Sequence, residues 1–430
     1  MKKSIVWFKT DLRLHDNQAL VEAIAHSDEI IPVYCLEDAL FQPSAYGFQK
    51  ISAFRLKFLL ESVKDLDQGL RVLGSGLLFL KGNPVVEIAK LAAERSVQKV
   101  YAKKEVTFEE KEVEAELEKA LWKTKCTLET FSTSTLYHAE DLPFSIKDIP
   151  DVFTNFRKKV EKEAQVRPVF EKPLAIHSPT IPALVLPTLE ALGMQNVISD
   201  ERAVLQFIGG ETAGLKRLHY YFSESKLVST YKDQRNGMIG SAYSSKFSAW
   251  LALGCLSPRE IYAELKKYEQ QFGSNESTYW LIFELLWRDY FRFMMKKHRN
   301  QFFQQKGIKE TEVIQNEHDE ESLQRWVSGE TGIDFVDANM RELKYTGFMS
   351  NRGRQVVASY FCNELKLDWR YGAAYFEQQL IDYDVCSNWG NWAYLAGVGN
   401  DPRGKRVFDI EKQAKTYDPK GEFVALWLQK

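Results

Sequence analysis

The chain has 430 residues, 44% of them hydrophobic, 13% aromatic and 27% charged, and its formal net charge is −2 at pH 7. This length exceeds what a single hydrophobic core usually organises, so two domains are expected. The near-neutral charge excludes a globally basic nucleic-acid binder, although it permits a local basic patch. No apolar run approaches the roughly 20 residues that cross a bilayer, which predicts an intracellular, cytoplasmic protein without membrane contact.

Residues 1–135 alternate between short β-rich runs and helical runs. The β-rich runs are 4–8, 30–36, 77–80, 99–102 and 126–131, and helical patterns occupy 51–66, 83–96 and 108–123. Such alternation is typical of a doubly wound parallel sheet, whose ligand crevice opens at the carboxyl ends of the strands. Gly74 and Gly76 precede a strand without a third glycine, so we reject a dinucleotide-binding fingerprint there.

Residues 136–200 differ in composition from the rest of the chain. Seven of the thirteen prolines fall there, which marks an extended connector with one short helix at 153–164. From residue 201 onward the pattern is helical and has no internal repeat. The sequence therefore predicts a Rossmann-like α/β domain over 1–135, a linker over 136–200 and an all-α domain over 201–430.

The cysteines and histidines are dispersed along all of these regions. The five cysteines form no C-x-x-C pair and the seven histidines no H-E-x-x-H motif. This argues against a disulfide framework and against a metal site. We expect buried thiols and no bound metal.

The helix predicted over 277–299 places charged residues among aromatic ones. Glu284 and Arg288 form an i,i+4 pair beside Trp280, Trp287 and Tyr290. A core helix with one salt bridge fits this pattern. A ligand cavity fits it too, because buried charges cost free energy unless they are paired or bound to a ligand.

Three further segments set polar residues at the start of apolar helices. The serines of 243–262 either cap a helix or hold phosphate oxygens. The mixture of carboxylates, amides and aromatic rings over 381–403 suits neither a plain core nor a solvated loop. The polar residues of the three segments are Ser244, Ser245, Ser248, Asn351, Arg352, Arg354, Gln355, Asp382, Asp384 and Asn388.

Together these segments resemble the photolyase/cryptochrome flavoprotein family. The resemblance rests on WFKTDLRLHDNQAL (7–20), KFSAWLALGCLSPR (246–259), ELLWRDYFRF (284–293), TGIDFVDANMRELKYTGFMSNRGRQ (331–355) and IDYDVCSNWGNW (381–392). The DASH cryptochrome branch is resembled most closely by 154–173, YKDQRNGMIG (231–240), NRGRQ, CSNWGNW and EKQAKTYDP (411–419). The family's architecture is an α/β antenna domain, a long linker and a helical FAD-binding domain.

The resemblance implies that the helical domain encloses FAD folded into a U. In that arrangement Arg354 and Asp382 form an ion pair beside the isoalloxazine, where a tethered guanidinium suits a reduced flavin anion. Asp384 lies along the flavin–ribityl edge, and Asn388 faces flavin N5. The pyrophosphate is held by Tyr231, Ser244, Ser245, Phe247 and Ser248, with Arg288 nearby.

The same resemblance implies a substrate, damaged DNA. Glu284, Asn351 and Gln355 would line the pocket for a flipped cyclobutane pyrimidine dimer. Arg235, Arg352 and Arg406 match positions that touch the DNA backbone and, with Lys296, Lys297 and Arg299, would form a basic rim.

Electron supply and light harvesting follow from the resemblance as well. Trp392 and Trp369 match the first two members of the family's tryptophan chain from flavin to surface, but Asn316 stands where the third is expected. Glu105 matches the acidic contact of an antenna chromophore, which the branch usually supplies as 5,10-methenyltetrahydrofolate.

The resulting expectation is FAD-dependent, blue-light-driven repair of pyrimidine dimers, preferentially in single-stranded DNA or looped duplex, by a monomer that joins the nucleoid when bound to DNA. A signalling cryptochrome and a flavin-dependent DNA-binding regulator are the alternatives. A (6–4) photolyase is disfavoured, because Met349 and Ser350 precede Asn351 where a histidine pair is expected.

Overall fold

The computed structural model describes residues 2–309, 319–404 and 406–429. Its N-terminal part is built on five strands, all paired in parallel in the order β3-β2-β1-β4-β5. This confirms the predicted doubly wound fold, in which the order of strands reverses between β1 and β4. The strands are β1 (Lys3–Phe8), β2 (Glu29–Glu37), β3 (Leu78–Gly82), β4 (Lys99–Lys103) and β5 (Thr127–Phe131).

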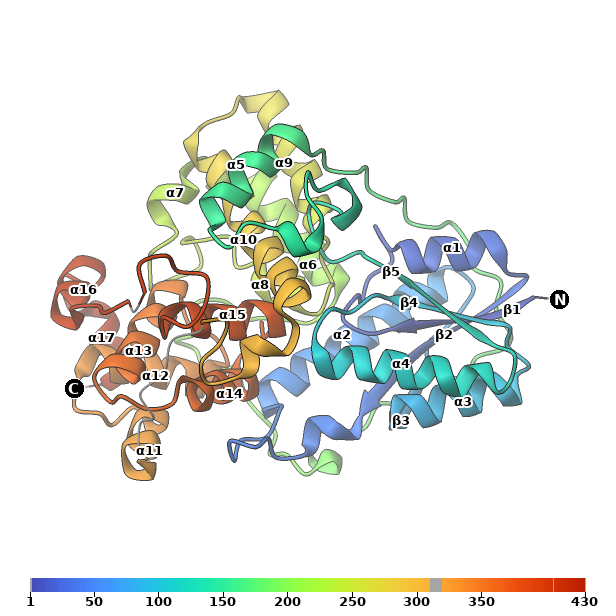
Figure 1. Ribbon diagram of the computed structural model, residues 1–430, viewed down its shortest axis with the longest axis horizontal. Helices are drawn as coiled ribbons and strands as arrows, with labels where there is room; N and C mark the ends of the chain where they lie inside the picture. Colours follow the sequence, from blue (N-terminus) through green and yellow to red (C-terminus); the bar gives the residue numbers. More distant parts are fainter. Residues whose placement is uncertain (1, 310–318, 405, 430) are drawn as a thin grey trace.

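Helices cover both faces of this sheet (Figure 1), which explains why its strands are apolar on both sides. Alternate residues of β1 enter different cores: Val6 and Phe8 pack with Leu56, whereas Ile5 and Trp7 pack with Ile88 and its neighbours. The four helices are α1 (Gln18–His26), α2 (Ala53–Val72), α3 (Pro84–Glu94) and α4 (Phe108–Trp122).

The C-terminal part is helical in the described ranges, with the long helix α10 at its centre (Figure 1). Asn275 and Thr278 form a capping box at the start of α10. The helices are α6 (Glu211–His219), α7 (Tyr231–Gln234), α8 (Ser248–Ala252), α9 (Pro258–Phe272), α10 (Glu276–His298), α11 (Glu320–Ser328), α12 (Asp334–Thr346), α13 (Asn351–Asn363), α14 (Trp369–Gln379), α15 (Val385–Leu395), α16 (Ile410–Tyr417) and α17 (Glu422–Leu428). None of them is long and apolar enough to cross a membrane, and no described cluster of His, Cys, Asp or Glu could hold a metal ion.

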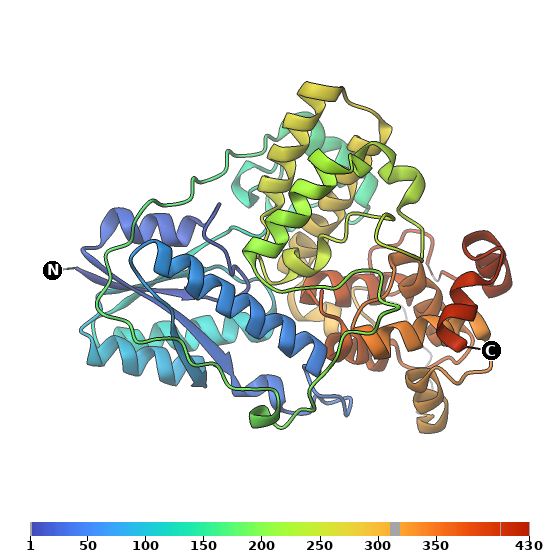
Figure 2. The same ribbon diagram turned by 180° about the vertical axis from the view of Figure 1, so that it is seen from behind.

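The connector between the two parts is extended, as its prolines predict, and runs along the α/β layer (Figure 2). Backbone bonds hold it there: Ile176 N donates to Leu73 O at 2.8 Å, and Ile30 N donates to His177 O at 2.9 Å. Its helix α5 (Phe153–Glu163) lies against α10, with Phe153 stacked on Trp287 at 3.7 Å between ring centroids. The domain limits at 135 and 200 remain predictions.

The segment 11–17 joins the two parts by buried polar contacts. Asp16, with no exposed surface, accepts hydrogen bonds from Arg259 of α9 (Nε–Oδ2 3.0 Å), from Ser257 and from the Phe170 backbone at 3.0 Å. Just before Asp16 in the same segment, the backbone N–H groups of Leu14 (3.0 Å) and His15 (2.9 Å) donate to the carboxylate of Glu211 in α6. A single loop of the α/β part therefore carries the ion pairs that fix α6 and α9.

Gly254 allows this contact to form at close range. Its φ is +65°, and a Cβ atom there would lie 2.2 Å from the carbonyl oxygen of Thr10. The Arg13 guanidinium, 2% exposed, then donates to the carbonyl oxygens of Gly254 (2.9 Å) and Thr133 (3.2 Å). The glycine that separates α8 from α9 is thus required by the approach of the other domain.

We expect Asp16→Asn to destabilise the protein by about 3–5 kcal/mol, because it leaves the buried Arg259 without its counter-charge. The measurement is the free energy of unfolding in urea. Asp38→Asn is the matched control, since Asp38 pairs with Lys81 at the surface, with side chains 56% and 45% exposed, and should change stability by less than about 1 kcal/mol. Equal effects of the two substitutions would contradict the role given to Asp16.

Candidate active site

A concave pocket opens between α13, α14 and α15, with about 530 Å³ of empty space that is partly open to solvent. It brings together many of the predicted site residues, which come from two segments of the chain. The predicted residues in its lining are Asn351, Arg354, Gln355, Asp382, Asp384, Asn388 and Trp392.

A fixed positive charge lies in the wall of this pocket. Arg354 Nη2 donates to Asp382 Oδ1 and Oδ2 at 3.0 and 2.8 Å, and its Nε donates to the carbonyl oxygen of Met349 at 2.9 Å. The Asp382 side chain is 1% exposed, whereas that of Arg354 is 25% exposed. The predicted ion pair is confirmed. Part of the guanidinium of Arg354 remains exposed, while its hydrogen bonds fix its orientation.

The start of α15 supplies acceptors and donors next to this pair. Asp384 caps the helix by accepting the N–H of Ser387 at 2.8 Å. Although burial favours the neutral acid, Arg288 and Arg292 hold the pKa of Asp384 below its ordinary value. Asn388 is anchored through Nδ2 to the Ala373 carbonyl at 2.9 Å, which leaves its amide oxygen toward the pocket side chains.

The i,i+4 pair predicted between Glu284 and Arg288 is wrong. Arg288 instead donates to the carbonyl oxygens of Ser134 and, at 3.3 Å, Leu251. Glu284 pairs with Arg235, which follows α7. Both side chains extend from α10 to partners that are far away in sequence. The buried charges of this helix are therefore satisfied by neighbouring elements and not by each other.

The serine segment forms a tight loop over 241–247 rather than a simple helix cap. Ser244 and Lys246 both have left-handed backbone angles, φ 54° and 64°. Arg217 of α6 holds the loop by donating to the carbonyl oxygens of Ser245 and Ser241, each at 3.0 Å. The buried Tyr231 lies next to Ser244, and burial raises its pKa well above the ordinary value.

The charge around this loop fits an anionic ligand such as the pyrophosphate of FAD. Burial and the neighbouring Arg217 lower the pKa of Lys246 to about 6, so Lys246 adds little charge at pH 7 and Arg217 is the cation that holds this loop. Polar atoms without a hydrogen-bond partner among the described residues lie buried close by, namely Tyr243 Oη and both carboxylate oxygens of Glu342. Orphaned buried polar atoms are costly, and a bound polar molecule would satisfy them. The residues present therefore fit FAD.

The three arginines expected at the DNA backbone each have a protein partner. Arg235 pairs with Glu284, and Arg406 pairs with Asp401 and donates to Tyr394 Oη at 2.6 Å. Arg352 donates to Gln355 Oε1 at 2.8 Å. Lys297 is also neutralised, by Asp151 at 2.9 Å. Arg235, Arg406 and Lys297 thus have carboxylate partners, whereas those of Arg352 are neutral, and the basic rim stays a prediction.

The two predicted tryptophans belong to one hydrophobic core but pack against different aromatic rings. Trp392 packs against Trp326, Phe361 and Phe376 with ring centroids 5.1 to 6.1 Å apart. Trp369 packs on Trp389 at 5.8 Å. Asn316, where a third tryptophan was expected, lies outside the described residues.

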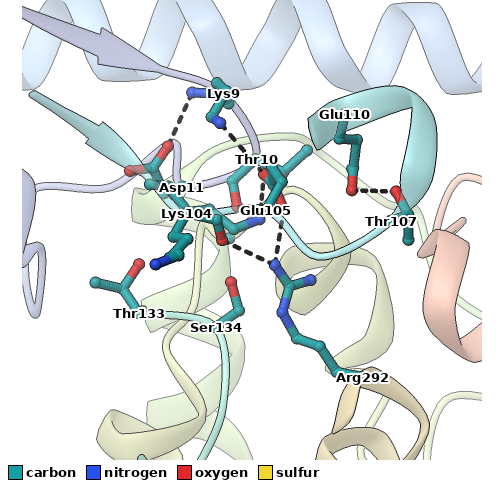
Figure 3. A network of polar contacts seen from close by, with 12 residues as sticks. Lys9, Thr10, Asp11, Lys104, Glu105, Thr107, Glu110, Thr133, Ser134 and Arg292 are labelled. Atoms are coloured by element: carbon teal, nitrogen blue, oxygen red, sulfur yellow. Dashed lines mark hydrogen bonds and ion pairs between the residues drawn. The ribbon is translucent and has the colours of Figure 1, made fainter. Parts of the chain in front are cut away.

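Glu105 lies at the carboxyl edge of the sheet, where the strand order reverses, and is buried rather than solvated (Figure 3). Its carboxylate pairs with Lys103 at 3.0 Å, with Arg292 of α10 at 2.7 Å and, more distantly, with Lys9 at 4.0 Å. Arg292 also donates to the Lys104 carbonyl at 3.2 Å. The crevice in which doubly wound folds usually bind ligands is thus partly filled by a cation from the helical part.

Sequence reasoning missed four charged residues of these sites: Arg217, Lys246, Arg292 and Glu342. Lys246 stands inside the serine run, and Glu342 lies inside the quoted segment 331–355, so position alone could have suggested both. Arg217 and Arg292 carry no local signal, because only the fold brings them to their partners.

Comparisons with known proteins agree with this geometry. A family model described as the FAD binding domain of DNA photolyase matches residues 280–430, and one described as DNA photolyase matches residues 4–177. The protein named Cryptochrome DASH from Gloeobacter violaceus is 49% identical over 430 residues, covering 99% of this chain and 85% of the relative. Its namesake from Danio rerio is 48% identical, covering 99% and 82%.

Solved structures show the same likeness. The cryptochrome of Synechocystis sp. PCC6803 has a TM-score of 0.96 and 48% identity, covering 100% of this chain and 89% of that one. An archaeal photolyase from Sulfolobus tokodaii, described with two FAD molecules, has a TM-score of 0.81 and 27% identity, covering 99% and 90%.

The carboxyl group of Glu110, close to Glu105 at the sheet edge, should make the stability of the protein depend on pH. Burial and the neighbouring Glu105 raise the pKa of Glu110 to about 7, so the folded state prefers its neutral form. That preference stabilises the protein at low pH and is lost as the pH rises through about 7. We expect Glu110→Gln to remove roughly 1–3 kcal/mol of the fall in unfolding free energy between about pH 5 and 8.

The free energy of unfolding of holoprotein in urea across this pH range is the measurement. Glu118→Gln is the control, because Glu118 is exposed on the same helix, α4. Parallel pH curves for Glu110→Gln and the unaltered protein would remove Glu110 as the titrating group.

Proposed function

The chain belongs to the photolyase/cryptochrome family, among its DASH cryptochromes, and binds FAD; from this premise we propose that it repairs cyclobutane pyrimidine dimers in DNA under blue light, with a preference for single strands. The observation that carries the proposal is the pocket itself. Its wall contains the guanidinium of Arg354, which Asp382 holds in place, and the amide side chains of Asn351 and Gln355. The positive charge for the flavin and the polar groups for the substrate would therefore line the same pocket.

Bound FAD in its reduced form would supply the electron that light transfers to the dimer. Arg354 would hold the flavin end by its fixed charge, because Asp382 prevents it from turning away. Asp384 and Asn388 would orient the ring by hydrogen bonds. The other proposed contacts, Tyr231, Ser244, Ser245, Phe247, Ser248 and Arg288, would enclose the rest of the molecule, with Arg217 adding positive charge.

Glu284 is suited to recognise the edge of a flipped base. Burial raises the pKa of its carboxyl group, while Arg235 opposes that shift. A carboxylate held by Arg235 can accept a hydrogen bond from the ring N–H of a pyrimidine. Asn351 at the head of α13 is exposed and supplies a second amide. Flipping the dimer out of the stack costs least in a single strand, which supports the proposed preference.

The antenna, location and assembly are parts of the same proposal. We assign 5,10-methenyltetrahydrofolate to the crevice near Glu105, where it would have to share that carboxylate with Lys103 and Arg292. The protein would act as a cytoplasmic monomer that joins the nucleoid through DNA. A blue-light receptor is the second candidate, because the relatives carry the name cryptochrome.

The experiment is restoration of thymine absorbance in oligo(dT) carrying dimers, under blue light with reduced holoprotein. We expect repair of single strands and less repair of duplex. Glu284→Ala should lower the repair yield roughly 10- to 100-fold, as for loss of a buried hydrogen bond to the reacting group, while flavin absorbance persists. No restoration with either substrate would favour the receptor.

Glu276→Ala is the matched control for Glu284→Ala. Glu276 belongs to the same helix, but its side chain is 71% exposed and pairs with Lys232. Its repair yield should equal that of the unaltered protein. Loss of flavin in Glu284→Ala would assign that residue a structural role instead.

Trp392→Phe should slow light-driven reduction of oxidised FAD at least tenfold, because phenylalanine is a far poorer electron donor than tryptophan. Repair by chemically reduced protein should persist, since Trp392 is buried among aromatic rings in the pocket wall and would act only in reducing the oxidised flavin. Bleaching of the flavin absorption under blue light with a thiol reductant measures the rate. A normal rate would show that the electron route assigned to Trp392 and Trp369 is incorrect.

A further inference from the structure

Arg352 differs from Arg235 and Arg354, the arginines next to it, because its described partners are neutral. Nη1 donates to Gln355 Oε1 at 2.8 Å and to Gln413 Oε1 at 3.5 Å, and Nη2 donates to Asn236 Oδ1 at 3.2 Å. The guanidinium carbon lies 4.4 Å from the ring centre of Tyr417. These contacts set the direction of the guanidinium without cancelling its charge.

The charge of Arg352 also meets a second cation. Burial, with the nearby Arg235, lowers its pKa, whereas Tyr417 opposes this shift. Arg235 has Glu284 as its counter-ion, and Arg352 has no carboxylate partner in the described part of the chain. Its Nε is buried and makes no hydrogen bond within the described residues. An anion is the ligand that such a group lacks.

Two of the partners of Arg352 come from α16, a helix that has little else to hold it. None of its residues is fully buried, and it lies at the outer edge of the helical region, next to α13 (Figure 1). Asp409 caps it by accepting the N–H of Lys412 at 3.0 Å, and Phe408 N donates to Ser359 Oγ at 3.0 Å just before it. The stack of Tyr417 on Arg352 therefore contributes much of its docking.

The contact with Gln355 also determines how this amide faces the pocket. Arginine is only a donor, so the amide oxygen of Gln355 must turn toward Arg352. The NH2 group of Gln355 is then left for the pocket, whose wall it helps to form. A donor at that point matches a carbonyl acceptor on a base edge.

We propose that α16, through Tyr417 and Gln413, positions Arg352 at the rim of the pocket for a phosphate of the DNA strand, and thereby fixes Gln355 as a hydrogen-bond donor toward the base. This inference rests on the proposed function for its substrate class. Tyr417 and Gln413 are positioning residues, since they act on the nucleic acid only through Arg352.

The test compares Tyr417→Leu with Tyr417→Phe, which keeps the ring. The readout is the dissociation constant, in the dark, for fluorescein-labelled oligo(dT) carrying one dimer, with the repair rate measured at saturating oligonucleotide. We expect Tyr417→Leu to weaken binding roughly three- to tenfold and to reduce the slope of log Kd against log salt by about 0.7. Tyr417→Phe should bind like the unaltered protein, and the saturating rate should change little.

Tyr345→Leu is the matched control, because Tyr345 also faces an arginine, Arg202 at 5.5 Å, and is 44% exposed away from the pocket. Equal weakening by Tyr345→Leu, or unchanged binding and salt slope in Tyr417→Leu, would overturn the proposal. Should Tyr417→Leu lose flavin or unfold early, Gln413→Leu replaces it, with a weaker effect of the same direction expected. If Tyr417→Leu weakens binding but neither the unaltered protein nor any variant repairs dimers, the positioning of Arg352 by α16 stands and the proposed repair function fails.

Discussion

The buried ion pair of Asp16 and Arg259 is the contact on which the arrangement of the two parts depends. Around it, Arg13, His15 and Glu211 pair backbone and side-chain groups that belong to both parts. Charges buried this deeply are tolerated only when every member is satisfied. The α/β layer and the helical region therefore meet in one geometry, and α10 reaches the sheet edge in a defined position.

Two arginines of the helical region, Arg288 and Arg292, have partners in the α/β part. Arg288 and Arg292 turn toward the α/β part, where they donate to Ser134 and pair with Glu105. Both still lower the pKa of Asp384 against the effect of its burial. Residues that hold the interface thus also set the charge of the pocket, which links the sheet edge to the flavin site by electrostatics rather than by movement.

Much of the fold could be predicted from the sequence, because the five strands follow from short apolar runs. The pair of Arg354 and Asp382, 28 positions apart, followed instead from the resemblance to the photolyase/cryptochrome family. The partners of Glu284 could not be predicted this way. Arg235 lies 49 positions away, so only tertiary packing brings it closer than Arg288, which is one helical turn distant. Arg292, the partner of Glu105, lies 187 positions away and is likewise brought there only by tertiary packing.

The extended linker has a consequence for how the molecule behaves when its chain is cut. Leu174, Val185 and Ile198 are among the most exposed apolar residues, at 95%, 81% and 87%. Between them, Arg71 Nη2 donates to the carbonyl oxygen of Pro182 at 2.9 Å, and Ser75 and Ser178 share a hydrogen bond of 2.6 Å. A protease that nicks this strap once would leave a single compact particle, with both fragments retained until denaturant separates them.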